Sequence, residues 1–396
     1  MRDSYKEYLI PIIITLVILT LSFFLHLKWC GSSMRQSEEI WQERLDYHLN
    51  YYPFSIRYFT TYSALFVKNL FALPPRESFF IIQFLLAIIM GPLFYRYLRL
   101  LSFDKIWANI GLFLLYSAYP ILGAHIEPVY TWDDFWVYIF LILTFTAIIK
   151  GRLLPASLFL TLGAFAREQT FLFWPVFVLA SFWYCRNYPR WKSIIYIAAP
   201  LIIYLPFYYI KWQPFPGRTE FIIYNFETPL RGSDSIFSFL ISFGVIWLTS
   251  AIGMGFARQK DRWVKSKLLI WGAILSVPTT AALTFFLTRA RETRIFFPPF
   301  IFLIPLTIIF LQSVYEYFRK TMPPLKIKIL FISLPVMLTI GIILAPLIFP
   351  AFEFRNCHRF HQQAFGFHLG LAMTIGIFYL MKIFDDRKKN GIITDS

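Results

Sequence analysis

Apolar segments long enough to cross a lipid bilayer constrain the fold of this 396-residue chain more than any other feature. A helix needs about 20 residues to cross a hydrocarbon layer of about 30 Å. Hydrophobic residues make up 58% of the chain and charged residues only 15%, a balance that a soluble globule of this length cannot arrange around one core. The sequence therefore predicts an all-α, polytopic membrane protein with a single transmembrane domain over residues 1–396.

Twelve apolar segments meet or approach this length, so we expect about 12 transmembrane helices. They cover residues 9–27, 79–95, 107–124, 134–149, 153–166, 169–184, 194–210, 236–256, 268–287, 295–314, 328–349 and 366–383. Residues 315–396 then hold the C-terminal spans and a short tail.

Lysine and arginine concentrate in short connections between these segments, such as residues 96–105 and 258–267, and in the tail at 387–389. Short cytoplasmic loops carry such an excess. The pattern predicts that both termini are cytoplasmic, in an integral multi-pass protein of a bacterial inner (plasma) membrane. Loop orientation and membrane lipids thereby explain the net charge of +16, and no nucleic-acid partner is expected.

Residues 28–78 form the first outer loop of this topology and carry a dense set of carboxylates. Ser37 followed by acidic residues is typical of a helix start, so we expect short interfacial helices over residues 37–48 and 54–71. A carboxylate in this loop can take a proton from an acceptor hydroxyl. Glu39 and Asp46 are therefore candidate general bases, and a solvated amphipathic helix is the alternative reading of each.

Arg167 and Glu168 interrupt the otherwise apolar segment 153–183. A charge at mid-membrane costs at least about 2.5 kcal/mol, so such residues usually face a polar cavity or a partner. Neighbouring residues on a helix do not face one another, so Glu168 is a poor partner for Arg167. We expect Arg167 to bind the phosphate of a lipid substrate, and Arg167→Ala to lose that binding while the protein still folds. An acidic partner on another helix is the alternative.

Two further charged groups lie at the outer ends of predicted spans. Asp133 and Asp134 open one span, where carboxylates also favour the positive pole of a helix dipole. A divalent ion is an open alternative for them, but we assign no metal ligand and no cofactor. Arg291 and Arg294 precede a later span, and guanidinium groups bind phosphate through two parallel hydrogen bonds.

Taken together, these motifs resemble those of the GT-C superfamily of integral membrane glycosyltransferases. The motifs are Tyr-Pro-Phe-X-X-Arg at 52–57, Trp-Asp-Asp at 132–134, Ala-Arg-Glu-Gln followed by Trp-Pro over 166–175, and Arg-Glu-Thr-Arg followed by Pro-Pro over 291–299. The resemblance covers roughly residues 9–315. It implies a GT-C-like fold and a glycosyltransferase whose lipid-linked sugar donor is a polyprenyl or dolichyl phosphate. The acceptor would be a saccharide, lipid or protein on the outer face.

The resemblance also implies roles for individual residues. Asp46 is the best match to the catalytic carboxylate, Glu39 is second, and Asp133 occupies the second acidic position. The substrate would be bound by Asp134, Glu168, Arg57, Arg167, Arg291 and Arg294.

Two other functional classes remain open. A transporter or flippase of lipid-linked saccharide would use the same arginines, but it should show internal repeats or paired broken helices, and the sequence shows one interruption. An oligosaccharide polymerase or ligase is expected to centre on a long outer loop late in the chain, rather than on an acidic loop after the first span.

Overall fold

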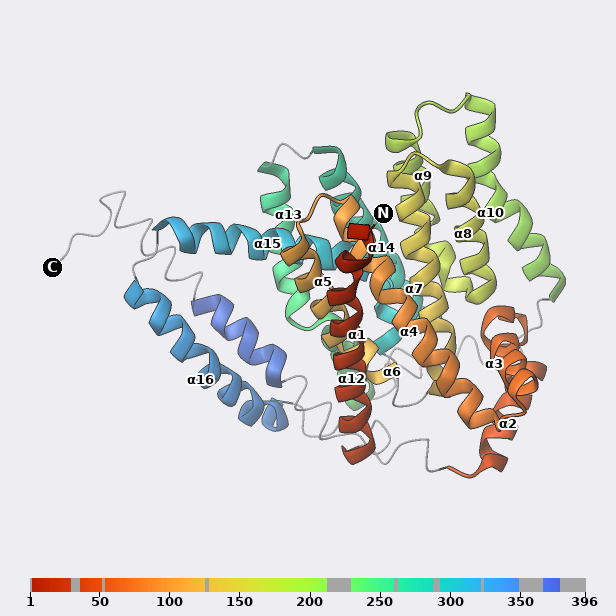
Figure 1. Cartoon of the computed structure of the whole chain (residues 1–396), viewed down its shortest axis with the longest axis horizontal. Helices are drawn as coiled ribbons and strands as arrows, with labels where there is room; N and C mark the ends of the chain where they lie inside the picture. Colours follow the sequence, from red (N-terminus) through yellow and green to blue (C-terminus); the bar gives the residue numbers. More distant parts are fainter. Residues whose placement is uncertain are drawn as a thin grey trace.

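A computed structural model describes residues 2–29, 36–51, 54–124, 128–211, 229–259, 263–287, 293–321, 324–348 and 366–377. Within these ranges the chain is helical and contains no strand, which confirms the all-α prediction. Figure 1 shows most of the helices gathered into one bundle, with α16 lying to one side of it.

The first ten helices are α1 (Arg2–Trp29), α2 (Glu38–Asn50), α3 (Tyr58–Phe71), α4 (Pro75–Leu100), α5 (Lys105–Ser117), α6 (Tyr119–Ala124), α7 (Pro128–Ile149), α8 (Leu153–Ala166), α9 (Trp174–Tyr184) and α10 (Arg190–Lys211). The later helices are α12 (Pro229–Phe243), α13 (Val245–Gln259), α14 (Trp263–Leu287), α15 (Phe300–Thr321) and α16 (Pro324–Ile348). Short 3₁₀ turns are η2 (Phe54–Ile56), η3 (Glu168–Phe173) and η4 (Thr293–Phe296).

Four of the described helices are long and apolar enough to cross a membrane, namely those over Pro75–Leu100, Arg190–Lys211, Lys265–Phe286 and Phe300–Tyr317. The pair α12–α13 adds a fifth if its 60° bend lies within one span. Other predicted spans are shorter or divided: α5 and α6 share residues 107–124, and α9 begins only at Trp174 of the predicted span 169–184, after η3. The described residues thus support a membrane protein with four or five clear spanning helices.

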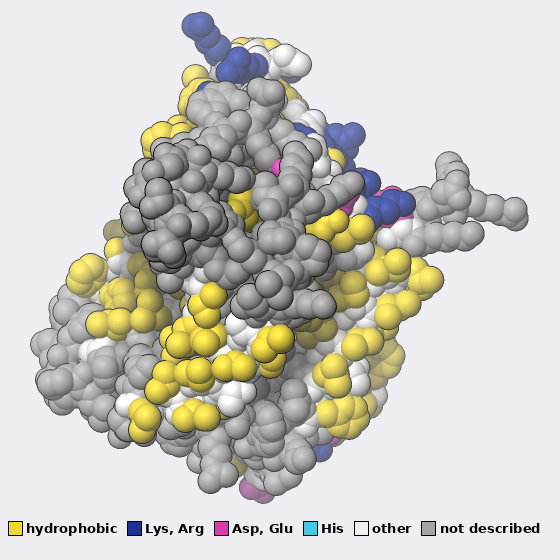
Figure 2. All heavy atoms as spheres, turned by 90° about the vertical axis from the view of Figure 1, so that its left-hand side faces the viewer, with side chains coloured by type: hydrophobic (Ala, Val, Ile, Leu, Met, Phe, Trp, Pro, Cys, Tyr) yellow, Lys and Arg dark blue, Asp and Glu magenta, His cyan; other side chains and the backbone are white. Residues whose placement is uncertain are grey.

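The surface of the bundle is apolar where a membrane would surround it. In the apolar stretch of α10 only 11% of the residues are buried inside the protein. Figure 2 shows hydrophobic side chains spread across another face, with most of the visible lysines and arginines towards the top of the view. Lipid tails are the natural solvent for such a surface, because a soluble protein rarely exposes contiguous apolar patches of this kind.

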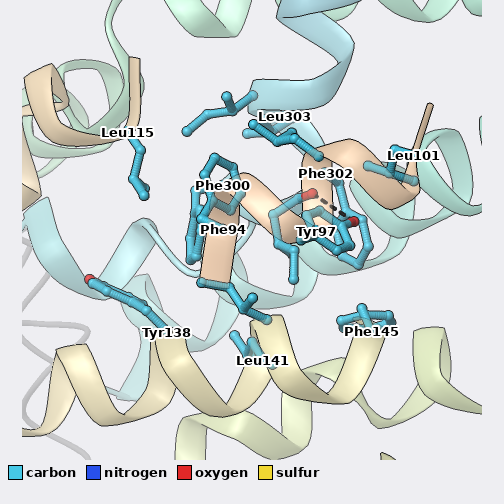
Figure 3. Packing of buried hydrophobic residues seen from close by; sticks show 14 of the residues in the cluster. Phe94, Tyr97, Leu101, Leu115, Tyr138, Leu141, Phe145, Phe300, Phe302 and Leu303 are labelled. Atoms are coloured by element: carbon cyan, nitrogen blue, oxygen red, sulfur yellow. Dashed lines mark hydrogen bonds between the residues drawn. The ribbon is translucent and has the colours of Figure 1, made fainter. Parts of the chain in front are cut away.

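Aromatic residues from three helices fill the centre of the bundle. The ring of Phe300 on α15 lies 5.5 Å from Phe94 of α4 and 5.3 Å from Tyr138 of α7, measured between centroids. The Tyr97 hydroxyl donates to the Ile301 carbonyl oxygen at 3.1 Å, and Figure 3 shows this bond within the cluster. Edge-on and tilted ring pairs of this kind add about 0.5–1.5 kcal/mol each beyond area burial. They hold α4, α7 and α15 in fixed relation.

The close packing of α13 on α15 leads to a stability prediction. A Cβ atom added at Gly253 would overlap the backbone carbonyl of Leu306, whereas one added at Gly255 would meet nothing within 4 Å. Because the obstacle is backbone, α13 and α15 must separate to accept a side chain. Gly253→Ala should therefore destabilise the protein by about 1–3 kcal/mol, the usual cost of overpacking.

Gly255→Ala, two residues along the same helix, is the matched control. It should be neutral or stabilising by up to about 1 kcal/mol, because alanine is the better helix former. Thermal unfolding of the purified variants in detergent compares the two. Equal effects of the two substitutions would contradict the proposed contact.

Candidate functional site

A break between α8 and α9 takes Arg167 out of the helix. Arg167 has extended backbone angles, φ −162° and ψ 133°, and η3 begins directly after it. The last turn of α8 is closed by Arg167 N–H and the Thr170 hydroxyl, which both donate to the Gly163 carbonyl oxygen at 2.9 Å. These bonds satisfy a carbonyl that the helix end would otherwise leave without a donor. The break therefore presents Arg167 and Glu168 at the end of α8 with a locally satisfied backbone.

Arg167 meets Asp134 of α7. Its Nη1 donates to Asp134 Oδ1 at 2.5 Å, and Arg294 Nη1 from η4 donates to Asp134 Oδ2 at 3.2 Å. Asp134 and Arg167 are both buried, with side-chain exposures of 5% and 7%. One carboxylate thus bridges two guanidinium groups from separate parts of the chain.

A second ion pair lies beside the first. Arg57, between η2 and α3, holds Glu168 through two parallel hydrogen bonds, Nε to Oε2 at 3.1 Å and Nη2 to Oε1 at 2.6 Å. The Arg57 side chain is 8% exposed and that of Glu168 is 33% exposed. The geometry is the fork-to-carboxylate arrangement in which charge-assisted bonds are strongest. Glu168 therefore marks the more open edge of the arrangement.

We call Arg57, Asp134, Arg167, Glu168 and Arg294 the ionic cluster. It contains three guanidinium groups and two carboxylates, and the formal charges of these five side chains sum to plus one. Taking charges out of water costs several kcal/mol per ion unless partners compensate. Guanidinium groups held in such a largely buried setting suit the binding of an anion such as phosphate.

The ionic cluster supplies the acidic partner on another helix that was the alternative for Arg167. Because Arg167→Ala would leave Asp134 buried with one cation fewer, we now expect that substitution to destabilise the protein as well. Asp134 lies in the second turn of α7 rather than at its start, because the helix begins at Pro128. The helix dipole, which acts within the first turn, therefore does not account for its position.

The first-loop carboxylates do not join the ionic cluster. The helix predicted over residues 37–48 is present as α2, and Asp46 and Glu39 lie on its exposed side. Asp46 Oδ1 accepts from Gln42 Nε2 at 3.0 Å, a contact within the same helix. The structure thus places both candidate bases at the surface.

A different residue of α2, His48, packs against the same aromatic ring as Arg57. His48 is buried, and its ring lies 4.4 Å from that of Phe54, measured between centroids. The guanidinium carbon of Arg57 lies 4.9 Å from the centroid of the same Phe54 ring. Sequence reasoning missed His48 because a single histidine at helical spacing among apolar residues gives no signal of its own.

Two more contacts around the ionic cluster were not predicted. The Tyr138 hydroxyl lies 3.5 Å from the Arg294 carbonyl oxygen, and Gln169 Nε2 donates to the Ile295 carbonyl oxygen at 2.5 Å. Both bonds tie η4 to neighbouring elements and so fix Arg294. Gln169 could have been anticipated, since it belongs to the polar interruption after Ala166.

Two predicted site positions fall outside what the structure describes. The Asp133 side chain and the whole of Arg291 belong to this group, so their predicted roles stay predictions. Among the described residues, no three His, Cys, Asp or Glu side chains converge in a group that could hold a metal ion.

Comparison with known proteins adds no identification: no protein-family model, no curated protein and no solved structure matches this chain.

Proposed function

We propose that this protein is a membrane glycosyltransferase of GT-C type, which moves a sugar from a polyprenyl-phosphate-type lipid donor to an acceptor. The observation that carries the proposal is the ionic cluster, which brings three guanidinium groups together in an apolar helical bundle. A phosphate on a lipid that stays in the bilayer is an anion matched to such a site. The resemblance of the sequence motifs to that superfamily supports the same assignment.

The reaction makes a specific demand on these residues. When the acceptor oxygen attacks the sugar carbon, the bond from that carbon to the phosphate oxygen breaks, and the phosphate leaves with the bonding electrons. Fixed cations in a site of low dielectric stabilise the developing negative charge without reorganising. Arg167 suits this role because the Nη1 bond to Asp134 holds its side chain in place.

A separate group must take the proton of the acceptor hydroxyl. Both oxygens of Asp134 already accept from guanidinium groups, so neither is directed at an acceptor. The base is therefore proposed among Asp46, Glu39 and Asp133, with Asp46 preferred by its place before the Pro-Phe-X-X-Arg pattern. Exposure of Asp46 and Glu39 leaves both within reach of an acceptor that arrives from water.

The proposed topology has about 12 spans and cytoplasmic termini, with the ionic cluster on the outer side. Basic connections at the opposite end support it. Lys265 Nζ, at the start of α14, donates to the Leu100 carbonyl oxygen at the end of α4, at 2.7 Å. The Tyr188 hydroxyl, between α9 and α10, lies 3.3 Å from the Leu153 nitrogen at the start of α8. Short basic loops gathered at one end are expected on the cytoplasmic side.

Donor binding tests the function directly. Arg167→Lys keeps the positive charge beside Asp134 but loses the planar fork that matches phosphate. The loss of one charge-assisted hydrogen bond should weaken binding of a polyprenyl-phosphate-linked sugar about 10- to 100-fold. Binding of a fluorescent or radiolabelled donor to the purified protein measures this, and the variant should retain wild-type thermal stability more closely than Arg167→Ala.

The control is Arg76→Lys, at an arginine paired with Glu38 and Glu77 away from the ionic cluster. It should bind donor as the wild type does. Unchanged donor affinity in Arg167→Lys would remove Arg167 from the proposed site. If the protein in proteoliposomes moves a lipid-linked sugar across the bilayer without consuming the donor, the transporter assignment replaces the enzyme assignment.

A further inference from the structure

Three basic side chains lie together at the end of the bundle opposite the ionic cluster. Arg96 belongs to the last turns of α4, while Lys150 and Arg152 flank Gly151 in the connection from α7 to α8, and all three are exposed. Slight burial of the ammonium group, and then the positive charges of Arg96 and Arg152, lower the pKa of Lys150. Because α4 packs against α7, the last turns of these two helices bring Arg96 near Lys150 and Arg152.

The connection that carries two of them has a defined shape. Gly151 has a φ of +67°, a conformation that favours glycine. Its N–H donates to the Ile148 carbonyl oxygen at 2.7 Å, and the Arg152 N–H donates to the Ala147 carbonyl oxygen at 2.9 Å. This pair of bonds is the Schellman arrangement that closes a helix end. The backbone therefore holds Lys150 and Arg152 at set positions rather than on a loose loop.

Two other basic residues at this end have partners within the protein. Arg99 Nε lies 3.1 Å from Glu7 Oε1, and Lys265 Nζ donates to the Leu100 carbonyl oxygen. In the part of the chain that the structure describes, no ion pair or hydrogen bond joins the side chains of Arg96, Lys150 or Arg152 to another residue. Among the described residues, no carboxylate therefore offsets the repulsion between these three cations.

An exposed apolar line leads along α4 to Arg96. Ile81, Leu85 and Ile89 are 42%, 49% and 41% exposed, and spacing by four residues places them on one helix face. Arg96, seven residues after Ile89, falls on the same face. An acyl chain lying along these side chains would bring its headgroup to Arg96.

We propose that Arg96, Lys150 and Arg152 bind the phosphate headgroup of an anionic phospholipid, whose acyl chain lies along Ile81, Leu85 and Ile89. Charge complementarity carries the assignment, because these three cations form no ion pair among the described residues and lie where the proposed topology puts the headgroups of the bilayer. A lipid with a net negative charge relieves their repulsion, whereas a zwitterionic lipid brings no net charge. The site is separate from the ionic cluster and does not depend on the proposed transferase activity.

Native mass spectrometry tests this with equimolar phosphatidylglycerol and phosphatidylcholine added to the purified full-length protein. The wild type should retain phosphatidylglycerol in preference to phosphatidylcholine. Each Lys or Arg near a charged membrane surface contributes about 1 kcal/mol, which corresponds to about 5-fold in affinity. Lys150→Gln should therefore lower the preference about 5-fold, and neutralising all three residues to Gln should abolish it.

The matched control replaces Arg186, Arg190 and Lys192 by Gln, which removes the same charge from the connection after α9 and the first turn of α10. It should keep the preference for phosphatidylglycerol. Equal loss in both triple variants would overturn the proposal, because bulk charge would then explain the binding. Glycerophosphoglycerol is the soluble headgroup without acyl chains. If it displaces the bound lipid at the same concentration as phosphatidylglycerol does, the acyl chain contributes nothing and the proposal is also overturned.

Discussion

Replacing Asp134 by alanine should lower the free energy of unfolding by about 3–5 kcal/mol, the usual cost of removing one partner from a buried ion pair. Asp134 accepts from both Arg167 and Arg294 and is 5% exposed. Without it, two guanidinium groups stay in the same confined space with no carboxylate between them. Chemical or thermal unfolding of the purified variant measures the loss.

A double-mutant cycle separates this pairing from simple loss of packing. Asp134→Asn and Arg167→Gln should each destabilise the protein, and the double variant should be more stable than the sum of the two effects predicts. Residues in direct contact show such coupling at about 0.5–3 kcal/mol. Asp46→Asn, at an exposed carboxylate, should change stability by less than about 0.5 kcal/mol. Additive effects of Asp134→Asn and Arg167→Gln would show that the ion pair does not form.

The largest effect on turnover is expected at Asp46. Asparagine has nearly the same shape as aspartate but cannot accept the proton of an attacking hydroxyl. Asp46→Asn should therefore reduce sugar transfer about 10²- to 10⁴-fold, the usual range for loss of a general base, while donor binding survives. Transfer of radiolabelled sugar from a polyprenyl-phosphate donor in proteoliposomes measures turnover, and donor binding is measured separately.

Glu43→Gln is the matched control, because Glu43 is exposed on the same helix. It should leave turnover unchanged. If Asp46→Asn keeps full activity while Glu39→Gln or Asp133→Asn abolishes it, the base lies elsewhere and the transferase assignment stands. If all three variants remain fully active, a carboxylate base in this region is excluded and the enzyme assignment loses its mechanism.

Local patterns in the sequence were sufficient for the class of fold and for several helix boundaries. Hydropathy predicted an all-α membrane protein, and acidic residues after Ser37 predicted the start of α2 at Glu38. The polar break after Ala166 predicted the separation of α8 from α9. These features depend on neighbouring residues, because helix periodicity, capping and membrane length are properties of short segments.

Charge partners were decided only by the tertiary structure. The pairs Arg57–Glu168, Arg167–Asp134 and Arg294–Asp134 join residues that are 111, 33 and 160 positions apart. The sequence marked Arg167 and Glu168 as costly to place in a membrane and the other three as candidate site residues, but which of them meet depends on how α3, α7, α8 and η4 pack together. Packing also turned Asp46 outward and His48 inward on α2. The free-energy cost of placing a charged residue in a membrane follows from its neighbours in the sequence. Its ion-pair partner depends on contacts between helices that are distant in the sequence.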